Sequence, residues 1–203
     1  MNITDLGVGP SEVALALDEN VSTSKNPFTG GSIITRMPGA KWNLTASWSK
    51  LLPEEANFMD AYIASSQGGA VKVRVPDLSF THPQGVRSGT VSVRVAGVDG
   101  NQLQTQGWTP STPGQLKIGD RFSFIDATTG LEEMHIVSAD VNSDSSGNAT
   151  LTFYPELKRL PGVGVSINIL TPGFTALVTK AKCSRSGLAA TASYTWEEAL
   201  YAV

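Results

Sequence analysis

The sequence predicts a mainly β protein, in which a β-sandwich domain with one amphipathic helix carries an inserted small barrel of the OB or SH3 kind. Two observations lead to this fold class. Apolar and polar residues alternate in many short runs, and turns rich in glycine and proline separate these runs. A helical spacing of apolar residues occurs in one segment, which begins at Pro53.

The first strands of the predicted sandwich lie before this helix. Val13, Leu15 and Leu17 alternate with other residues and predict one strand. Residues 41–49 predict another, with Trp42 and Trp48 on its inward face and polar residues at the alternate positions. Between them, the polar stretch Ser22–Pro27 is expected to be a loop that becomes ordered against a neighbouring molecule.

The helix is predicted over residues 53–67. Proline suits the first helical position, and Glu54 and Glu55 favour the positive end of the helix dipole. Gly68 and Gly69 can supply the left-handed residue that ends a helix. The apolar stripe comprises Phe58, Met59, Tyr62 and Ile63, and a strand with Val71, Val73 and Val75 facing inward is expected to follow.

The predicted barrel occupies residues 88–170, and the sandwich residues 1–87 and 171–203. The borders fall in the poorly patterned stretch 76–89 and at Thr171-Pro172-Gly173, and about five strands lie between them. One of these contains Val163, Val165, Ile167 and Ile169. A last strand over residues 188–196 alternates apolar residues and is expected to complete the sheet that contains Trp42 and Trp48.

Composition narrows the classes of function. The 203-residue chain has one cysteine, Cys183, so an internal disulfide and a zinc site of several cysteines are excluded, and a buried, unreactive thiol is expected. A net charge of −3 disfavours a surface that binds nucleic acid through its phosphates. No apolar segment is long enough for a membrane span, and no secretion signal is recognisable at the N-terminus, so the product is expected to stay where it is made.

One spacing of residues resembles the start of a calcium loop. Asp140, Asn142 and Asp144 alternate as the first oxygen ligands would, but Ser145 and Leu151 occupy the positions that need a glycine and a bidentate carboxylate. A hairpin turn accounts for these residues better. The two histidines, His82 and His135, are too few for a metal triad, and His135 is expected on the polar face of its strand. No metal and no cofactor are therefore predicted.

The search for catalytic groups gives a negative prediction. The pairs Glu54-Glu55, Glu132-Glu133 and Glu197-Glu198 are expected to be solvated, and no nucleophile elbow is recognisable. Gly162-Val163-Gly164 lacks the further glycine and the helix of a phosphate-binding loop. The chain is therefore not predicted to be an enzyme, and no residue is assigned a catalytic role.

The barrel could still bind a sugar or a single-stranded nucleic acid, because such barrels offer aromatic platforms. Phe122, Phe124 and Phe153 fit an inward row, whereas Tyr154 faces out. Core packing is favoured over a platform, and replacing Tyr154 or Trp108 would test the alternative.

Four segments together resemble a known family. They are residues 48–53 leading into the helix, 116–122, 138–155, and the final Trp196-Glu197-Glu198. This pattern is similar to that of distal tail proteins of long-tailed bacteriophages, in which a belt domain carries an OB-like barrel. Residues 1–87 and 171–203 would be the belt.

The resemblance implies a structural virion protein, made in the host cytoplasm and located in the tail. It implies a ring, usually of six copies, that links the tail tube to the tail tip or baseplate. Its partners would be further copies of itself, the tail tube protein and the tail hub or tip protein, with the tape measure protein as a further candidate, and no sequence-specific nucleic acid. The alternatives are another tail or head-to-tail joining protein, or an oligosaccharide- or single-strand-binding barrel.

The net negative charge of the chain suggests the charge of the channel wall in such a ring. Negative or neutral walls let DNA pass without binding, because the phosphates then keep their counterions. The lumen is therefore expected to be neutral or acidic.

Overall fold

The computed structural model describes residues 2–37, 39–79, 84–96, 100–187 and 189–200. Within these residues the chain forms one α-helix, two short 3-10 helices and a series of strands. In chain order they are η1 (Ile3–Leu6), β1 (Glu12–Asp18), β2 (Val21–Lys25), β3 (Ser32–Arg36), β4 (Lys41–Leu51), α1 (Pro53–Ser65), η2 (Gln67–Gly69), β5 (Val73–Pro76), β6 (Gly89–Val93), β7 (Gln102–Trp108), β8 (Arg121–Ile125), β9 (Glu132–Val137), β10 (Asn148–Tyr154), β11 (Ile167–Asn168), β12 (Gly173–Ser186) and β13 (Ala189–Glu198).

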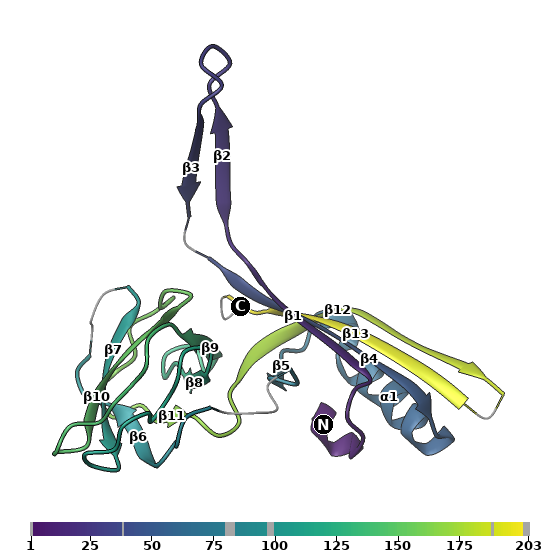
Figure 1. Ribbon diagram of the computed structural model, residues 1–203. Helices are drawn as coiled ribbons and strands as arrows, with labels where there is room; N and C mark the ends of the chain where they lie inside the picture. Colours follow the sequence, from purple (N-terminus) through teal and green to yellow (C-terminus); the bar gives the residue numbers. More distant parts are fainter. Residues whose placement is uncertain (1, 38, 80–83, 97–99, 188, 201–203) are drawn as a thin grey trace.

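The strands form two large sheets and one separate hairpin (Figure 1). A five-stranded sheet in the order β1-β4-β13-β12-β5 curls into a half-barrel, and a six-stranded sheet in the order β11-β8-β9-β10-β7-β6 forms a nearly closed barrel. These sheets confirm the predicted fold class, which is mainly β with one α-helix, a sandwich-type domain and a small barrel. The predicted borders at 87/88 and 170/171 fall between β5 and β6 and between β11 and β12.

The five-stranded sheet is built on β4, β13 and the helix α1, as the alternation in the sequence predicts. Strand β13 pairs with β4 so that Trp196 lies opposite Leu44. The rings of Tyr194 and Trp196 stack at 5.3 Å, and Trp48 meets Trp196 edge-on at 6.4 Å. Offset and edge-to-face contacts are the favourable geometries for aromatic rings. These aromatic side chains form the centre of the sheet's core.

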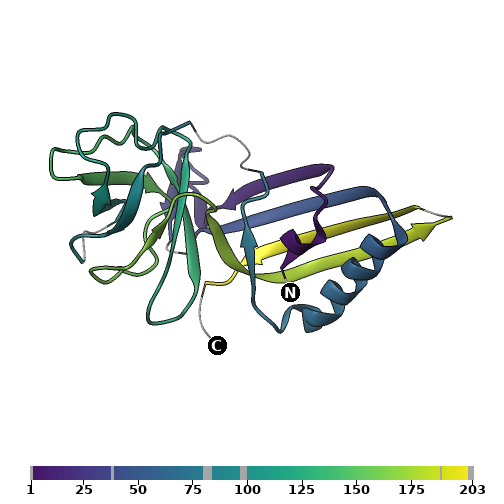
Figure 2. The same cartoon turned by 90° about the horizontal axis from the view of Figure 1, so that it is seen from below.

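Helix α1 covers one face of this sheet, as Figure 2 shows. Met59 and Tyr62 are buried, while Phe58 and Ile63 are half-buried at the margin of the same core. The Glu55 carboxylate accepts a hydrogen bond from the backbone N–H of Leu52 at 2.7 Å, which satisfies one of the free donors at the helix start. The predicted helical stripe is thus confirmed, with the two central residues contributing most of the burial.

Two predicted strands are shorter than their apolar patterns suggest. Val71 is 38% exposed and precedes β5, because the chain passes through η2 and a turn before it can pair with β12. Val163 is exposed and Val165 half-buried, and β11 contains only Ile167 and Asn168. A backbone hydrogen bond from Val93 to Val165 replaces regular pairing there. Leu188, predicted to begin the last strand, lies outside the described residues.

The polar stretch Ser22–Pro27 was expected to be a loop, and this prediction is wrong. Val21–Lys25 pairs with Ser32–Arg36 in an antiparallel hairpin. The turn between them is closed by Asn26, whose side-chain oxygen accepts the N–H of Phe28 at 2.9 Å. Threonine and serine are compatible with a solvated strand, so polarity alone does not distinguish a loop from an exposed hairpin.

Candidate functional site

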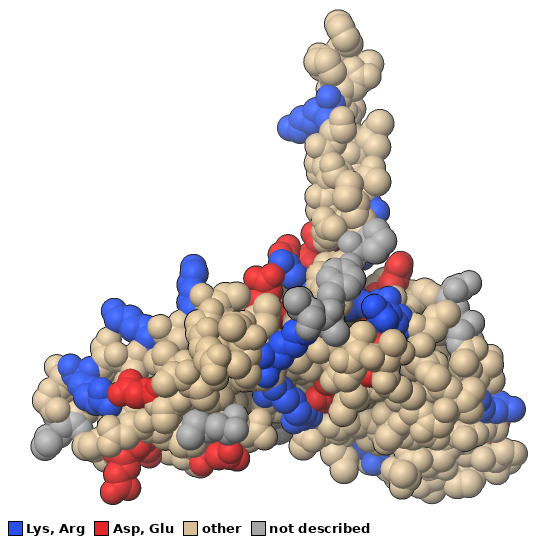
Figure 3. Space-filling model, turned by 180° about the vertical axis from the view of Figure 1, so that it is seen from behind, with Lys and Arg blue, Asp and Glu red and all other residues tan. Residues whose placement is uncertain are grey.

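The hairpin β2-β3 projects from the body of the molecule, away from both large sheets (Figure 1). Every residue of its two strands is exposed. Four of its exposed side chains are large and apolar: Val21 at 46%, Phe28 at 95%, Ile33 at 68% and Ile34 at 67%. Figure 3 shows this arm standing free above the body, with basic atoms in its upper part. Such an arrangement offers apolar surface that nothing in the described part of the chain covers.

The face of the five-stranded sheet opposite α1 is a second candidate surface, which we call the helix-free face. Alternation along each strand places on it mainly polar and small side chains, together with the half-buried Leu177 of β12, which lies opposite Glu197. The polar and small side chains are those of Glu12, Ala14, Ala16 and Asp18 of β1, Lys41, Asn43, Thr45 and Ser47 of β4, Lys180, Lys182 and Ser184 of β12, and Thr191, Ser193, Thr195 and Glu197 of β13. All of them are exposed or half-buried.

The charges on the helix-free face balance. Lys41 and Glu197 form an ion pair, and the remaining two acidic residues, on β1, are equalled in number by two lysines on β12, which β4 and β13 separate from β1. Hydroxyl groups lie between these charges, and Thr45 and Thr195 approach each other at 3.3 Å across the β4-β13 pair. The face is therefore hydrophilic and neutral, and it offers no cluster of basic residues to hold phosphates.

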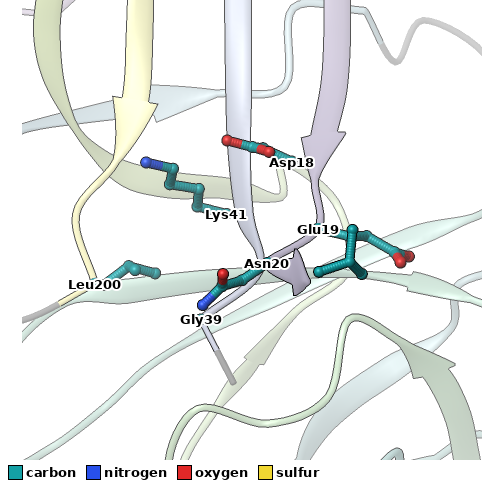
Figure 4. A pocket seen from close by; sticks show the side chains of 7 residues that line it. Asp18, Glu19, Asn20, Gly39, Lys41 and Leu200 are labelled. Carbon is teal, nitrogen blue, oxygen red and sulfur yellow. The ribbon is translucent and has the colours of Figure 1, made fainter. Parts of the chain in front are cut away.

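Two hollows flank the foot of the hairpin. One, of about 490 Å³, is lined by Asp18, Glu19, Asn20, Val21, Gly39, Lys41 and Leu200 (Figure 4). The other, of about 310 Å³, lies between the β3 side of the hairpin and the segment Pro155–Arg159 that follows β10. In Figure 4 the side chains of Asp18 at the end of β1, of Glu19 directly after it and of Lys41 at the start of β4 surround the first hollow and do not converge on a common point. This hollow therefore lacks the converging polar groups typical of a catalytic site.

The barrel is fixed to the five-stranded sheet by buried polar contacts that the sequence did not reveal. The predictions of solvated Glu132-Glu133 and Glu197-Glu198 are wrong for three of the four residues, because Glu132, Glu133 and Glu198 are at most 5% exposed. Glu132 binds Arg74 of β5, and Glu198 binds Lys158. The indole N–H of Trp42 donates to the carbonyl of Met134 at 2.8 Å.

Strand β9 is buried on both faces, which explains these errors. One face, with Met134, packs against the core of the five-stranded sheet, and the other, with His135, packs inside the barrel. A strand buried on both faces has no solvated side, so polar residues on it must find partners instead of water. Alternation therefore gave the wrong environment for its acidic residues.

His135 was expected on a polar face and is instead fully buried. Its ring lies 5.6 Å from that of Phe124 and 4.8 Å from that of Phe153, and Nδ1 lies 2.9 Å from the carbonyl oxygen of Pro155. Burial lowers the pKa of His135 to about 3, so the imidazole is neutral at neutral pH. The other histidine, His82, lies outside the described residues.

Burial also shifts the carboxylates beside this histidine. Desolvation raises the pKa of Glu133 to about 7, although Lys158 opposes the shift and the Glu198 and Asp126 carboxylates add to it. The pKa of Glu198 is raised for the same principal reason, burial. A carboxyl group titrating near neutral pH is a feature of catalytic acids as well as of buried structural groups. The neighbours of Glu133 are His135, whose Nε2 lies 3.9 Å from the carboxylate, and the charged groups of Lys158, Glu198 and Asp126.

This carboxyl gives a testable pH dependence. Because the folded pKa of Glu133 lies above its ordinary value of 4.5, the unfolded chain loses this proton first, and stability falls as the pH rises from about 4.5 to 7. The full shift corresponds to about 3 kcal/mol. Glu133→Gln should therefore gain up to about 3 kcal/mol over the wild type at pH 8 and little at pH 5. Urea denaturation at both pH values measures this, and an equal difference at the two would contradict it.

The oxygens of the calcium-like triplet are engaged in local hydrogen bonds. Asp140 pairs with Lys117, the Asn142 side chain accepts the N–H of Gly114 at 2.7 Å, and Asp144 accepts the N–H groups of Ser146 and Asn148 at 2.8 Å. These hydrogen bonds stabilise a loop and a turn between strands. Within the described residues, no group of three or more His, Cys, Asp or Glu side chains could hold a metal ion.

The aromatic residues of the barrel divide as predicted. Phe122, Phe124 and Phe153 are buried, and Tyr154 is 42% exposed. Trp108, the other candidate platform, is 3% exposed, and its indole N–H donates to Thr105 at 2.7 Å. Of these five residues, Tyr154 alone is open to a ligand.

Cys183 is half-buried near helix α1, so the prediction of a buried thiol is met in part. Burial is the largest cause that raises the pKa of this thiol above its ordinary value, and the Asp60 carboxylate adds to the shift. Both effects favour the less reactive protonated form.

Comparisons with known proteins add no assignment. No helix in the described part of the chain is long and apolar enough to cross a membrane. The sequence matches no protein-family model, and a search of curated proteins finds none with a similar sequence.

Proposed function

We propose that this chain is a structural, non-catalytic ring subunit of a bacteriophage tail, in which copies of the five-stranded sheet surround a channel. In this proposal the ring has six copies and links the distal end of the tail tube to the tail tip. The resemblance of the sequence to distal tail proteins motivates the assignment to a tail.

The observation that carries the proposal is the helix-free face. It runs across four strands, consists mainly of polar and small side chains with Leu177 as a large apolar exception, and carries no excess of either charge. Hydroxyl groups and balanced charges are suited to the wall of a channel for DNA, because such a wall neither repels nor retains the phosphates. Helix α1 on the opposite face would then lie on the outside of the ring.

The edges of the sheet support closure into a ring. Strand β1 pairs only with β4 within the described residues, so its other edge presents free backbone donors and acceptors. A ring uses one patch of each copy against a different patch of the next, and an open sheet edge can serve as one of the two. The partners would be further copies, the tail tube protein and the tail hub or tip protein.

The proposal is tested by imaging the purified chain and by analysing virus particles. Light scattering after size-exclusion chromatography should give a mass of about six times 21.4 kDa at high protein concentration, and negative-stain microscopy should show closed rings. Mass spectrometry of purified particles of the virus that encodes the chain should detect it. Its absence from these particles would refute the assignment to a tail.

A barrel that binds a single strand or an oligosaccharide is the second candidate function. The exposed Tyr154 is the observation in its favour, since a ring open to solvent can stack on a base or a sugar. Loss of binding to single-stranded DNA or oligosaccharide arrays on Tyr154→Ala would support it.

A further inference from the structure

The hairpin β2-β3 carries apolar side chains on both of its faces. Residues opposite each other in an antiparallel pair point to the same side. Ile34 lies opposite Thr23, and Ile33 lies opposite Ser24, so the two isoleucines point to opposite sides. Both are about equally exposed, at 67% and 68%. A hairpin that only lay on a flat surface would bury one of them and leave the other in water.

The hairpin is also open along its edges. Within the described residues, β2 and β3 form a two-stranded sheet of their own, so the outer edge of each has unpaired backbone groups. An isolated two-stranded hairpin is marginally stable in water, and it becomes stable when it packs against other structure. Both faces and both edges thus indicate a partner that encloses the hairpin.

Charge favours one kind of partner. Residues 21–36 contain Lys25 and Arg36 and no acidic residue, and Arg36 forms an ion pair with Glu19 of the same copy at 3.2 Å, so Lys25 is the charge that bears on a partner. The whole chain has 15 basic and 18 acidic residues, so the rest of it has 13 basic and 18 acidic residues and a net charge of −5. A basic hairpin and an acidic body are electrostatically complementary, which favours association of one copy with another.

We propose that the hairpin 21–36 of one copy inserts into a second copy of this chain, which buries both of its faces. The proposal deepens the proposed function and rests on it in one respect, because the ring supplies the second copy. Each copy would give one hairpin and receive one, as a head-to-tail ring requires.

The test compares three variants with matched chemistry. Ile33→Asp and Ile34→Asp each place a charge on one face of the hairpin. Ile118→Asp makes the same change at a comparably exposed isoleucine (60%) in the loop before β8. The hairpin belongs to neither core, so all three variants should keep the melting temperature of the wild type at concentrations at which the chains are separate. The concentration at which copies associate is measured by light scattering and sedimentation.

Ile33→Asp and Ile34→Asp should each raise this concentration at least about tenfold, whereas Ile118→Asp should change it by less than about twofold. If one of the two hairpin variants associates like the wild type, the hairpin lies on a surface and the two-sided insertion is refuted. If both do so while rings still form, the hairpin is not an assembly contact, although the ring remains.

Two further outcomes separate this inference from the proposed function. Association that depends on both isoleucines but gives no closed ring would support the inference and refute the ring. A wild-type chain that stays monomeric at every concentration would refute the inference, and a different protein would then be the occupant to test.

Discussion

Replacing Lys158 by methionine is expected to destabilise the protein by about 3–5 kcal/mol at pH 8. The Lys158 ammonium binds the Glu198 carboxylate, and its side chain is 13% exposed while that of Glu198 is 1% exposed. It also opposes the raised pKa of Glu133. Without it, two buried carboxylates would lack a compensating charge, and a buried charge without a partner is costly.

The pH dependence of this loss has a definite sign. The pKa values of Glu133 and Glu198 are both raised by burial, so lowering the pH protonates these groups and removes the uncompensated charge. The loss should therefore be smaller at pH 5 than at pH 8. Urea denaturation of the wild type and the variant at both pH values measures it. Adding Glu198→Gln should restore part of the stability, and a loss under about 1 kcal/mol at pH 8 would mean that solvent screens the pair.

The second large effect is expected at the centre of the five-stranded sheet. Trp196→Ala should cost about 3–5 kcal/mol, because the indole is fully buried and contacts both Tyr194 and Trp48. This loss is large compared with the free energy of unfolding of a folded domain, which is about 5–15 kcal/mol. Phe28→Ala is the control: this ring is 95% exposed at the hairpin tip, so thermal unfolding of the separate chains should not change. Equal destabilisation by the two changes would contradict this core.

The sequence was sufficient to predict those parts of the fold that face water on one side. Alternation in β4 and β13 correctly placed Trp42, Trp48 and Trp196 inside, and the helical stripe correctly placed Met59 and Tyr62. These elements separate apolar from polar residues in space, so the periodicity of the sequence reflects their environment.

Strand β9 and the hairpin could not be predicted in the same way, for opposite physical reasons. In β9 both faces are buried, and Glu132 and Glu133 depend on partners that lie far away in the sequence, such as Arg74. In the hairpin both faces are exposed in the single chain, so no alternation marks the strands. In each case the environment depends on contacts that a local pattern does not contain.

The candidate surfaces were predictable only in part. Alternation in β4 and β13 indicates the polar side of the sheet, but Lys180 and Lys182 join it only because β12 has a register shift between Val178 and Lys180. A bulge of this kind moves the following side chains to the other face. The balance of charge on the helix-free face therefore could not be predicted from alternation in the sequence and required the structure.

The central claim, that copies of this chain form a ring around a channel, is tested most directly by a cryo-electron microscopy map of the assembled protein. We expect Thr45, Ser193 and Thr195 to face the channel and α1 to lie on the outer surface, with a neutral or acidic wall. A ring with α1 toward the channel, or with a channel lined mainly by lysine and arginine, would contradict the claim.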